Sequence, residues 1–111
     1  MTRKVLQAAA SADDLLNAHD PVLDAVEVNV PNLGFSVKVR GMTRGEVRRI
    51  IDEIEDKTEI EANAIATCVV EPPFTLEQAT KFVTEKGSGT VGPILDRILD
   101  LSGLTPGFRQ D

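Results

Sequence analysis

Residues 26–40 of the chain read VEVNVPNLGFSVKVR, and this stretch decides the fold. Apolar residues alternate with polar ones in both halves, which is the period of a β-strand with one buried face. Between the halves, Pro31-Asn32-Leu33-Gly34 combines a fixed φ, a side chain tolerant of left-handed geometry and a glycine, a set typical of a four-residue loop. The stretch therefore predicts an antiparallel β-hairpin over residues 26–40 whose apolar face carries Val26, Val28, Val30, Phe35, Val37 and Val39.

An isolated hairpin is barely stable in water, so helices or another chain must cover its apolar face. On the N-terminal side, Ser11 and Asp14 resemble a capping box and predict a short helix over residues 11–18, closed by Pro21. On the C-terminal side, Thr43 with Glu46 opens a helix over residues 43–57 with an apolar stripe of Val47, Ile50, Ile51 and Ile54.

Three further helices are predicted beyond residue 57. Thr58 with Glu61 opens the first, which Pro72-Pro73 ends because proline lacks the backbone donor that a helix needs. Thr75 with Gln78 opens the second, which stops at Lys86-Gly87. The last runs over residues 90–102 and ends at Gly103-Leu104 in a Schellman-like pattern.

The predicted fold class is therefore α+β: an N-terminal short helix and an antiparallel β-hairpin, followed by about four α-helices. A length of 111 residues and a mass of 12.0 kDa correspond to one domain. We expect a flexible N-terminus over residues 1–10, a single domain over 11–104 and a flexible C-terminal tail over 105–111.

Composition disfavours several classes of function. A net charge of −6 disfavours a nucleic acid partner, because phosphates attract basic surfaces. Aromatic residues make up 4% and are all phenylalanine, which disfavours a small-molecule pocket or a base-stacking platform. No apolar run is long enough for a membrane span or a signal peptide, so we expect a cytosolic protein with no membrane association.

The sequence has no motif whose context supports catalysis or metal binding, and we predict no catalytic residue, no metal site and no cofactor. Residues 87–92 read GSGTVG, but a helix is predicted before them where a dinucleotide site needs a strand. His19 is the single histidine and is expected at a helix end, interacting with terminal carbonyls. Cys68 is expected to be a small buried hydrophobe with no neighbouring cation, and the acidic residues of 52–61 a solvated face.

Charge is segregated in a more informative way. Residues 38–49 contain five basic residues and one acidic residue in an otherwise acidic chain. Spacing predicts that four of the basic side chains share one surface: Lys38, Arg40, Arg44 and Arg48. Two interpretations stay open: intramolecular pairing with Asp52 and Glu53, or a docking surface for an acidic partner, which another copy of this chain would provide.

Four segments together carry a family resemblance: residues 11–16 (SADDLL), 26–31 (VEVNVP), 37–46 (VKVRGMTRGE) and 101–104 (LSGL). In this order they resemble the tail assembly chaperones of long-tailed phages and prophages, over residues 11–104. Many relatives carry a Trp-Gly-Gly turn where this chain has Leu33-Gly34-Phe35, and the loop after Val70 is a short Pro72-Pro73.

The resemblance implies a non-enzymatic assembly factor in the cytoplasm of a bacterial host. Such a protein binds the tape-measure protein, helps to recruit tail-tube subunits, self-associates and is absent from the mature virion. A second class of function also fits the residues: a small protein-binding regulatory or adaptor domain with a basic docking patch at Lys38, Arg40, Arg44 and Arg48.

Overall fold

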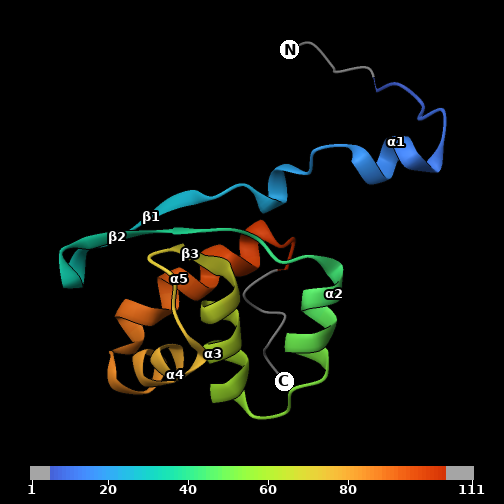
Figure 1. Ribbon diagram of the computed structural model, residues 1–111. Coiled ribbons are helices and arrows are strands. Elements are labelled where there is room, and N and C mark those ends of the chain that lie inside the picture. The colour runs from blue at the N-terminus through green and yellow to red at the C-terminus, as the bar shows by residue number, and fades with distance from the viewer. Residues whose placement is uncertain (1–5, 105–111) are drawn as a thin grey trace.

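The computed structural model describes residues 6–104 and confirms the α+β class. A three-stranded antiparallel sheet in the order β1-β2-β3 lies against helices α3 and α5, α4 packs on α3, and α2 stands beside α3 (Figure 1). The predicted termini lie partly outside the described residues, namely 1–5 and all of 105–111, while residues 6–10 are exposed and form no helix or strand.

The hairpin is confirmed with the predicted loop. Strand β1 (Val26–Val30) pairs with β2 (Phe35–Val39) in a register that joins Val26 to Val39 and Val30 to Phe35. A 3-10 turn over Pro31–Leu33 connects them, followed by Gly34 at φ +72°, where a side chain would be strained. One expectation about its apolar face is wrong: Phe35, at the start of β2 next to the turn, is 74% exposed.

A third strand replaces the end of a predicted helix. Helix α3 (Lys57–Cys68) stops four residues before Pro72, and β3 (Val69–Glu71) pairs with β2 through Val39↔Val69 and Lys38↔Glu71. β-Branched Val69 and Val70 fit a pleated sheet better than a helix end. The start of α3 also differs from the prediction, because the side chain of Asp56 accepts from the Thr58 backbone N–H and caps the helix in place of Thr58.

The helix predicted over 43–57 is shorter and has two parts. Its N-terminus is confirmed, since Thr43 and Glu46 form a full capping box at α2 (Arg44–Val47). From Arg48 to Asp52 the chain widens into a π-helical turn, in which the Arg48 carbonyl accepts from Glu53 N–H at 3.1 Å. The helix then ends, so the predicted residues 53–57 are not part of it.

The last two helices agree with the sequence at three of their four ends. Thr75 and Gln78 cap α4 (Leu76–Glu85) reciprocally, and α5 (Ser88–Leu101) starts two residues before the predicted Thr90. Gly103 at φ +79° and the 2.8 Å bond from Leu104 N–H to the Leu99 carbonyl form the Schellman-like end that the sequence predicts. The core between sheet and helices centres on fully buried side chains: Val39, Ile50, Ile65, Cys68, Ile94 and Ile98.

Helix α1 (Ala12–Asn17) belongs to an arm that leaves this body. Ser11 and Asp14 cap it as predicted, yet none of its residues is buried and it lies apart from the other helices (Figure 1). The arm is attached through Val22, whose carbonyl accepts from Gly41 N–H at 2.8 Å. Next to this bond, Met42 N–H donates to the Ser102 hydroxyl at 2.8 Å, so the arm, the end of β2 and the end of α5 meet at one junction.

Candidate functional site

An open apolar groove of about 280 Å³ lies beneath the turn end of the hairpin. Its walls come from the hairpin, from the segment after β3 and from helices α4 and α5. Three of the chain's four phenylalanines contribute to it. The lining consists of Val30, Leu33, Phe35, Ser36, Val37, Pro72, Phe74, Phe82 and Ile94.

Local contacts hold the groove open. Phe74 and Phe82 pack edge to face with ring centroids 5.3 Å apart, which fixes the segment after β3 against α4. The turn is held over the start of α5 by a 3.1 Å hydrogen bond from the Asn32 amide to the hydroxyl of buried Thr90. Phe35 therefore stands on the rim with most of its ring in solvent, an arrangement that costs free energy unless something covers it.

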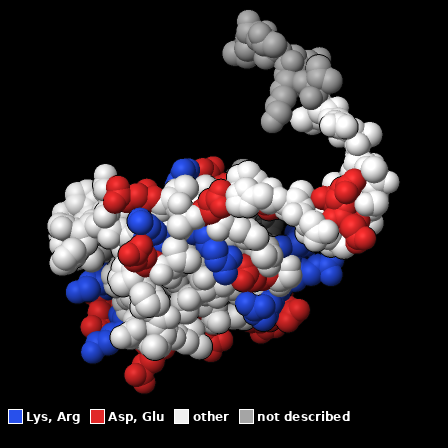
Figure 2. Space-filling model, turned by 45° about the horizontal axis from the view of Figure 1, so that its top comes forward, with Lys and Arg blue, Asp and Glu red and all other residues white. Residues whose placement is uncertain are grey.

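The surroundings of the groove are partly charged. A neighbouring depression shares Phe74 and Phe82 with the groove and is also lined by Lys81, Glu85 and Lys86. Neither lysine forms an ion pair within residues 6–104. The hairpin turn itself carries no charge, and Figure 2 shows an uncharged surface at that end of the hairpin, with basic and acidic side chains on the neighbouring part of the body.

The four basic residues predicted to form one docking surface have different roles in the structure: two form ion pairs and two are exposed. Lys38 pairs across the sheet with Glu71 at 3.3 Å, and Arg40 pairs with Glu46 at 2.9 Å. Arg44 and Arg48 are exposed one helical turn apart, with no ion pair in the described part of the chain. Intramolecular pairing thus holds for two of the four, with partners other than the expected Asp52 and Glu53.

Arg40 and Glu46 form a structural ion pair rather than a free docking element. Two guanidinium nitrogens donate to the two Glu46 oxygens at 2.9 and 3.0 Å, and one also donates to the Gly41 carbonyl. Both side chains are about four-fifths buried, at 21% and 17% exposed. Hydrogen bonding to Arg40 lowers the pKa of Glu46 to about 2, and the same bond raises the pKa of Arg40.

The single cysteine is fully buried, as predicted, but its surroundings differ from the prediction. Arg40 is close enough to favour the thiolate electrostatically, and its backbone N–H donates to the Cys68 carbonyl at 3.0 Å. Burial outweighs this effect and raises the pKa of Cys68 to about 12. A nucleophile needs the thiolate, so Cys68 is unsuited to that role.

We expect Cys68 to resist alkylation in the folded protein. Relative to the ordinary pKa of 9.0, a pKa of about 12 lowers the thiolate fraction at pH 8 by about 1,000-fold. Iodoacetamide labelling followed by mass spectrometry should be fast in urea and limited by opening of the fold in buffer. Rapid labelling in buffer would show that the thiol is accessible and contradict this assignment.

The remaining candidate groups have local structural roles. His19 Nε2 lies 3.0 Å from the Asp24 carboxylate rather than against helix carbonyls, and it is exposed. The GSGTVG segment follows helix α4, as expected, and Gly87 is the N-cap of α5. Among the described residues, no group of three or more His, Cys, Asp and Glu side chains is placed to hold a metal ion.

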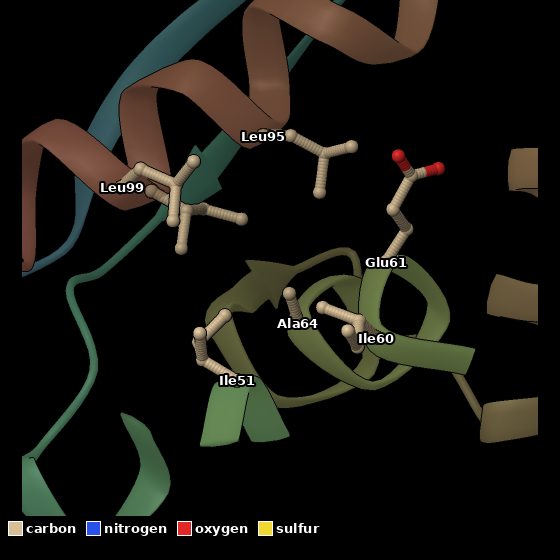
Figure 3. Close-up of a pocket in the computed structure, with 7 residues that line it drawn as sticks. Ile51, Ile60, Glu61, Ala64, Leu95 and Leu99 are labelled. Carbon is tan, nitrogen blue, oxygen red and sulfur yellow. The ribbon is translucent and has the colours of Figure 1, made fainter. Parts of the chain in front are cut away.

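A second gap of about 10 Å³ lies between α3, α5 and the π-helical turn. In Figure 3, Leu95 and Leu99 point toward Ile60 and Ala64, with Ile51 closing one side and Glu61 at the edge. Such a volume corresponds to about one water-sized probe, and the lining is mostly apolar. This gap is a packing imperfection of the core and not a ligand site.

Comparisons with protein-family models, curated proteins and solved structures find no match to this chain. None of the helices formed by residues 6–104 has the length and apolar character that crossing a membrane requires.

Proposed function

We propose that this protein is an assembly chaperone of the phage-tail kind, which binds the tape-measure protein through the groove beneath the hairpin turn. The observation that carries the proposal is the open apolar groove rimmed by exposed Phe35. The resemblance of residues 11–104 to tail assembly chaperones supplies the identity of the client.

The groove suits an apolar peptide surface better than a metabolite. Ser36 is the polar residue in a lining that is otherwise aliphatic, aromatic or proline, so few groups could orient a polar ligand. Its volume of about 280 Å³ accommodates one or two large apolar side chains. An amphipathic helix presents such side chains at i, i+3 or i+4, which is the usual way a helix occupies a hydrophobic groove.

The role follows from this mode of binding. A long helical client exposes apolar stripes before it is enclosed by tube subunits, and copies of the chaperone would cover those stripes and keep the client soluble. This would take place in the cytoplasm of the bacterial host. Tail-tube subunits would then displace the chaperone, and it would therefore be absent from the mature virion.

A protein-binding adaptor is the second candidate, and one observation favours it. Arg44 and Arg48 lie exposed in α2 and the π-helical turn that follows it, and neither side chain lines the groove. An acidic partner would be attracted to these two arginines, and its affinity would fall as salt is raised.

Co-expression with the tape-measure protein tests both candidates in one design. We expect wild type to keep the long client soluble in a complex with many copies, measured by size exclusion with light scattering. Phe35→Asp should lower the affinity for the client at least about tenfold, because it places a charge on the groove rim at a site whose side chain is already mostly in solvent.

Arg44→Glu with Arg48→Glu is the matched control, since both side chains are exposed and unpaired in the described structure. The chaperone proposal expects this variant to bind as wild type does. Loss of binding in the arginine variant alone would favour the adaptor, and an insoluble client beside monomeric wild type would refute the chaperone proposal.

A further inference from the structure

The N-terminal arm carries apolar side chains that no part of the described chain, residues 6–104, covers. Leu6, Leu15 and Leu16 are 80%, 71% and 79% exposed, and no residue of α1 is buried. The arm is nevertheless structured, because Asp14 accepts from the backbone N–H groups of Ala10 and Ser11 and closes a capping box. Because this capped helix presents two adjacent leucines to water, their burial against another apolar surface would be favourable.

The arm leaves the body at the end opposite to the groove, so it is poorly placed to cover the groove of its own chain. Its attachment at Val22 lies beside Gly41, just past the end of β2, whereas the groove lies at the opposite end of the hairpin, under the turn. Figure 1 shows α1 projecting beyond the body on the side away from that turn. To reach its own groove, the arm would have to reverse direction and run back along the whole of β1.

Charge favours a meeting between the arm and the groove. Between Leu6 and Ala25 the sequence has four aspartates and no lysine or arginine. The carboxylates of three of these aspartates have local partners, at the two caps and with His19, and Asp13 is the one without a partner among residues 6–104. Beside Phe74 and Phe82 at the groove, two lysines, Lys81 and Lys86, stand with one acidic residue, Glu85, so this depression has a net positive charge, and Figure 2 shows the acidic patch on the projecting arm.

We propose that the arm of one copy of this chain docks into the groove of a second copy. Leu15 and Leu16 enter the apolar lining near Phe35 and Phe82, and the acidic first turn of α1 faces Lys81 and Lys86. This inference goes beyond the proposed function, because it requires only a second copy and no client. A client with apolar helical stripes would compete with the arm for the same groove.

Two variants separate the halves of this contact without disturbing the core. Leu15→Asp with Leu16→Asp removes the arm's apolar face, and Phe35→Asp alters the groove; all three side chains are more than 70% exposed. By light scattering with refractive-index detection, wild type should have a mass of at least twice 12.0 kDa. Each variant alone should return to a mass of 12.0 kDa.

Mixing the two variants is the decisive step. The arm-altered chain keeps an intact groove, and the groove-altered chain keeps an intact arm, so the mixture should form a heterodimer with one arm-to-groove contact. It will need a higher concentration than wild type, which can make two contacts. Wild type that stays monomeric would overturn the proposal. A mixture that contains only monomers would overturn it as well, because intact arms and intact grooves would then be present together without pairing.

Charge and client binding provide independent checks. Lys81→Glu with Lys86→Glu should weaken self-association, and Arg44→Glu with Arg48→Glu should leave it unchanged. The arm-altered chain should bind the tape-measure client at least as tightly as wild type, because its groove is vacated. Failure of client binding together with intact arm exchange would therefore refute the proposed function and leave this inference standing.

Discussion

Gly41→Ala should lower the free energy of unfolding by about 2 to 3 kcal/mol, although it adds a single methyl group. A Cβ atom at this position would lie 2.6 Å from a methyl of Val22 and 2.9 Å from the backbone oxygens of both Val22 and Leu101. Backbone atoms cannot rotate away as side chains can, so the junction that joins the arm, β2 and α5 must separate. The cost arises from steric overlap, because the φ of Gly41 is not positive.

Urea unfolding followed by far-UV circular dichroism measures this effect, and Gly45→Ala is the matched control. Gly45 lies in α2 with Thr43 Oγ1 at 3.9 Å as the nearest atom to an added Cβ. Alanine favours a helix more than glycine does, so the control should be as stable as wild type or more stable by up to about 1 kcal/mol. Equal midpoints for Gly41→Ala and wild type would show that the junction yields.

Acid should remove about 2 to 3 kcal/mol of stability through Glu46 alone. Its pKa is 4.5 in the unfolded chain and about 2 in the folded protein, where Arg40 donates two hydrogen bonds to it. The unfolded state therefore binds the proton more readily, and stability rises with pH across this interval. The contribution is fully present above pH 4.5 and is lost as pH falls toward about 2.

Glu46→Gln isolates this contribution from those of the other carboxylates. Glutamine keeps a side-chain oxygen for the Thr43 cap but has no charge for Arg40. The difference in unfolding free energy between wild type and variant should be largest at neutral pH and shrink as pH falls below 4.5. A difference that stays constant between pH 7 and pH 3 would mean that the Glu46 carboxylate is not selectively stabilised by the fold.

Local signals in the sequence predict much of this fold. Capping boxes at Ser11, Thr43 and Thr75 locate helix starts because a short-range contact between N-cap and N3 decides them. The hairpin follows from strict alternation around a loop that requires a positive φ at Gly34. Each of these elements is determined by residues within a few positions of one another.

Elements decided by distant contacts were not predictable in the same way. The residues of β3 continue the helical spacing of α3, and their pairing with β2 depends on a strand 30 positions away in the register Val39↔Val69. The π-helical turn after Val47 likewise leaves no mark in a stripe of apolar residues that fits an ordinary helix. In both cases tertiary packing overrides the local period.

The candidate site shows the same division. Charge counting found the basic residues near Arg40, but Glu46 matched a capping motif, which concealed its second role as the partner of Arg40. Residues from four separate segments line the groove, so no local sequence motif predicts it. The sequence offers one clue to the groove, which is the position of its phenylalanines. Phe35 follows the hairpin turn, Phe74 follows the proline pair, and Phe82 lies on the next helix.

The junction at Gly41 and Met42 also governs the order in which the chain can fold. The bond from Met42 to Ser102 closes a sequence separation of 60 residues, whereas the hairpin and the α3–α4 pair form from neighbouring segments. Contacts of long separation carry a larger loop-closure entropy, so they form late. A nascent chain therefore acquires its hairpin and central helices first, and it completes the junction between Met42 and Ser102 only after the last helix has left the ribosome.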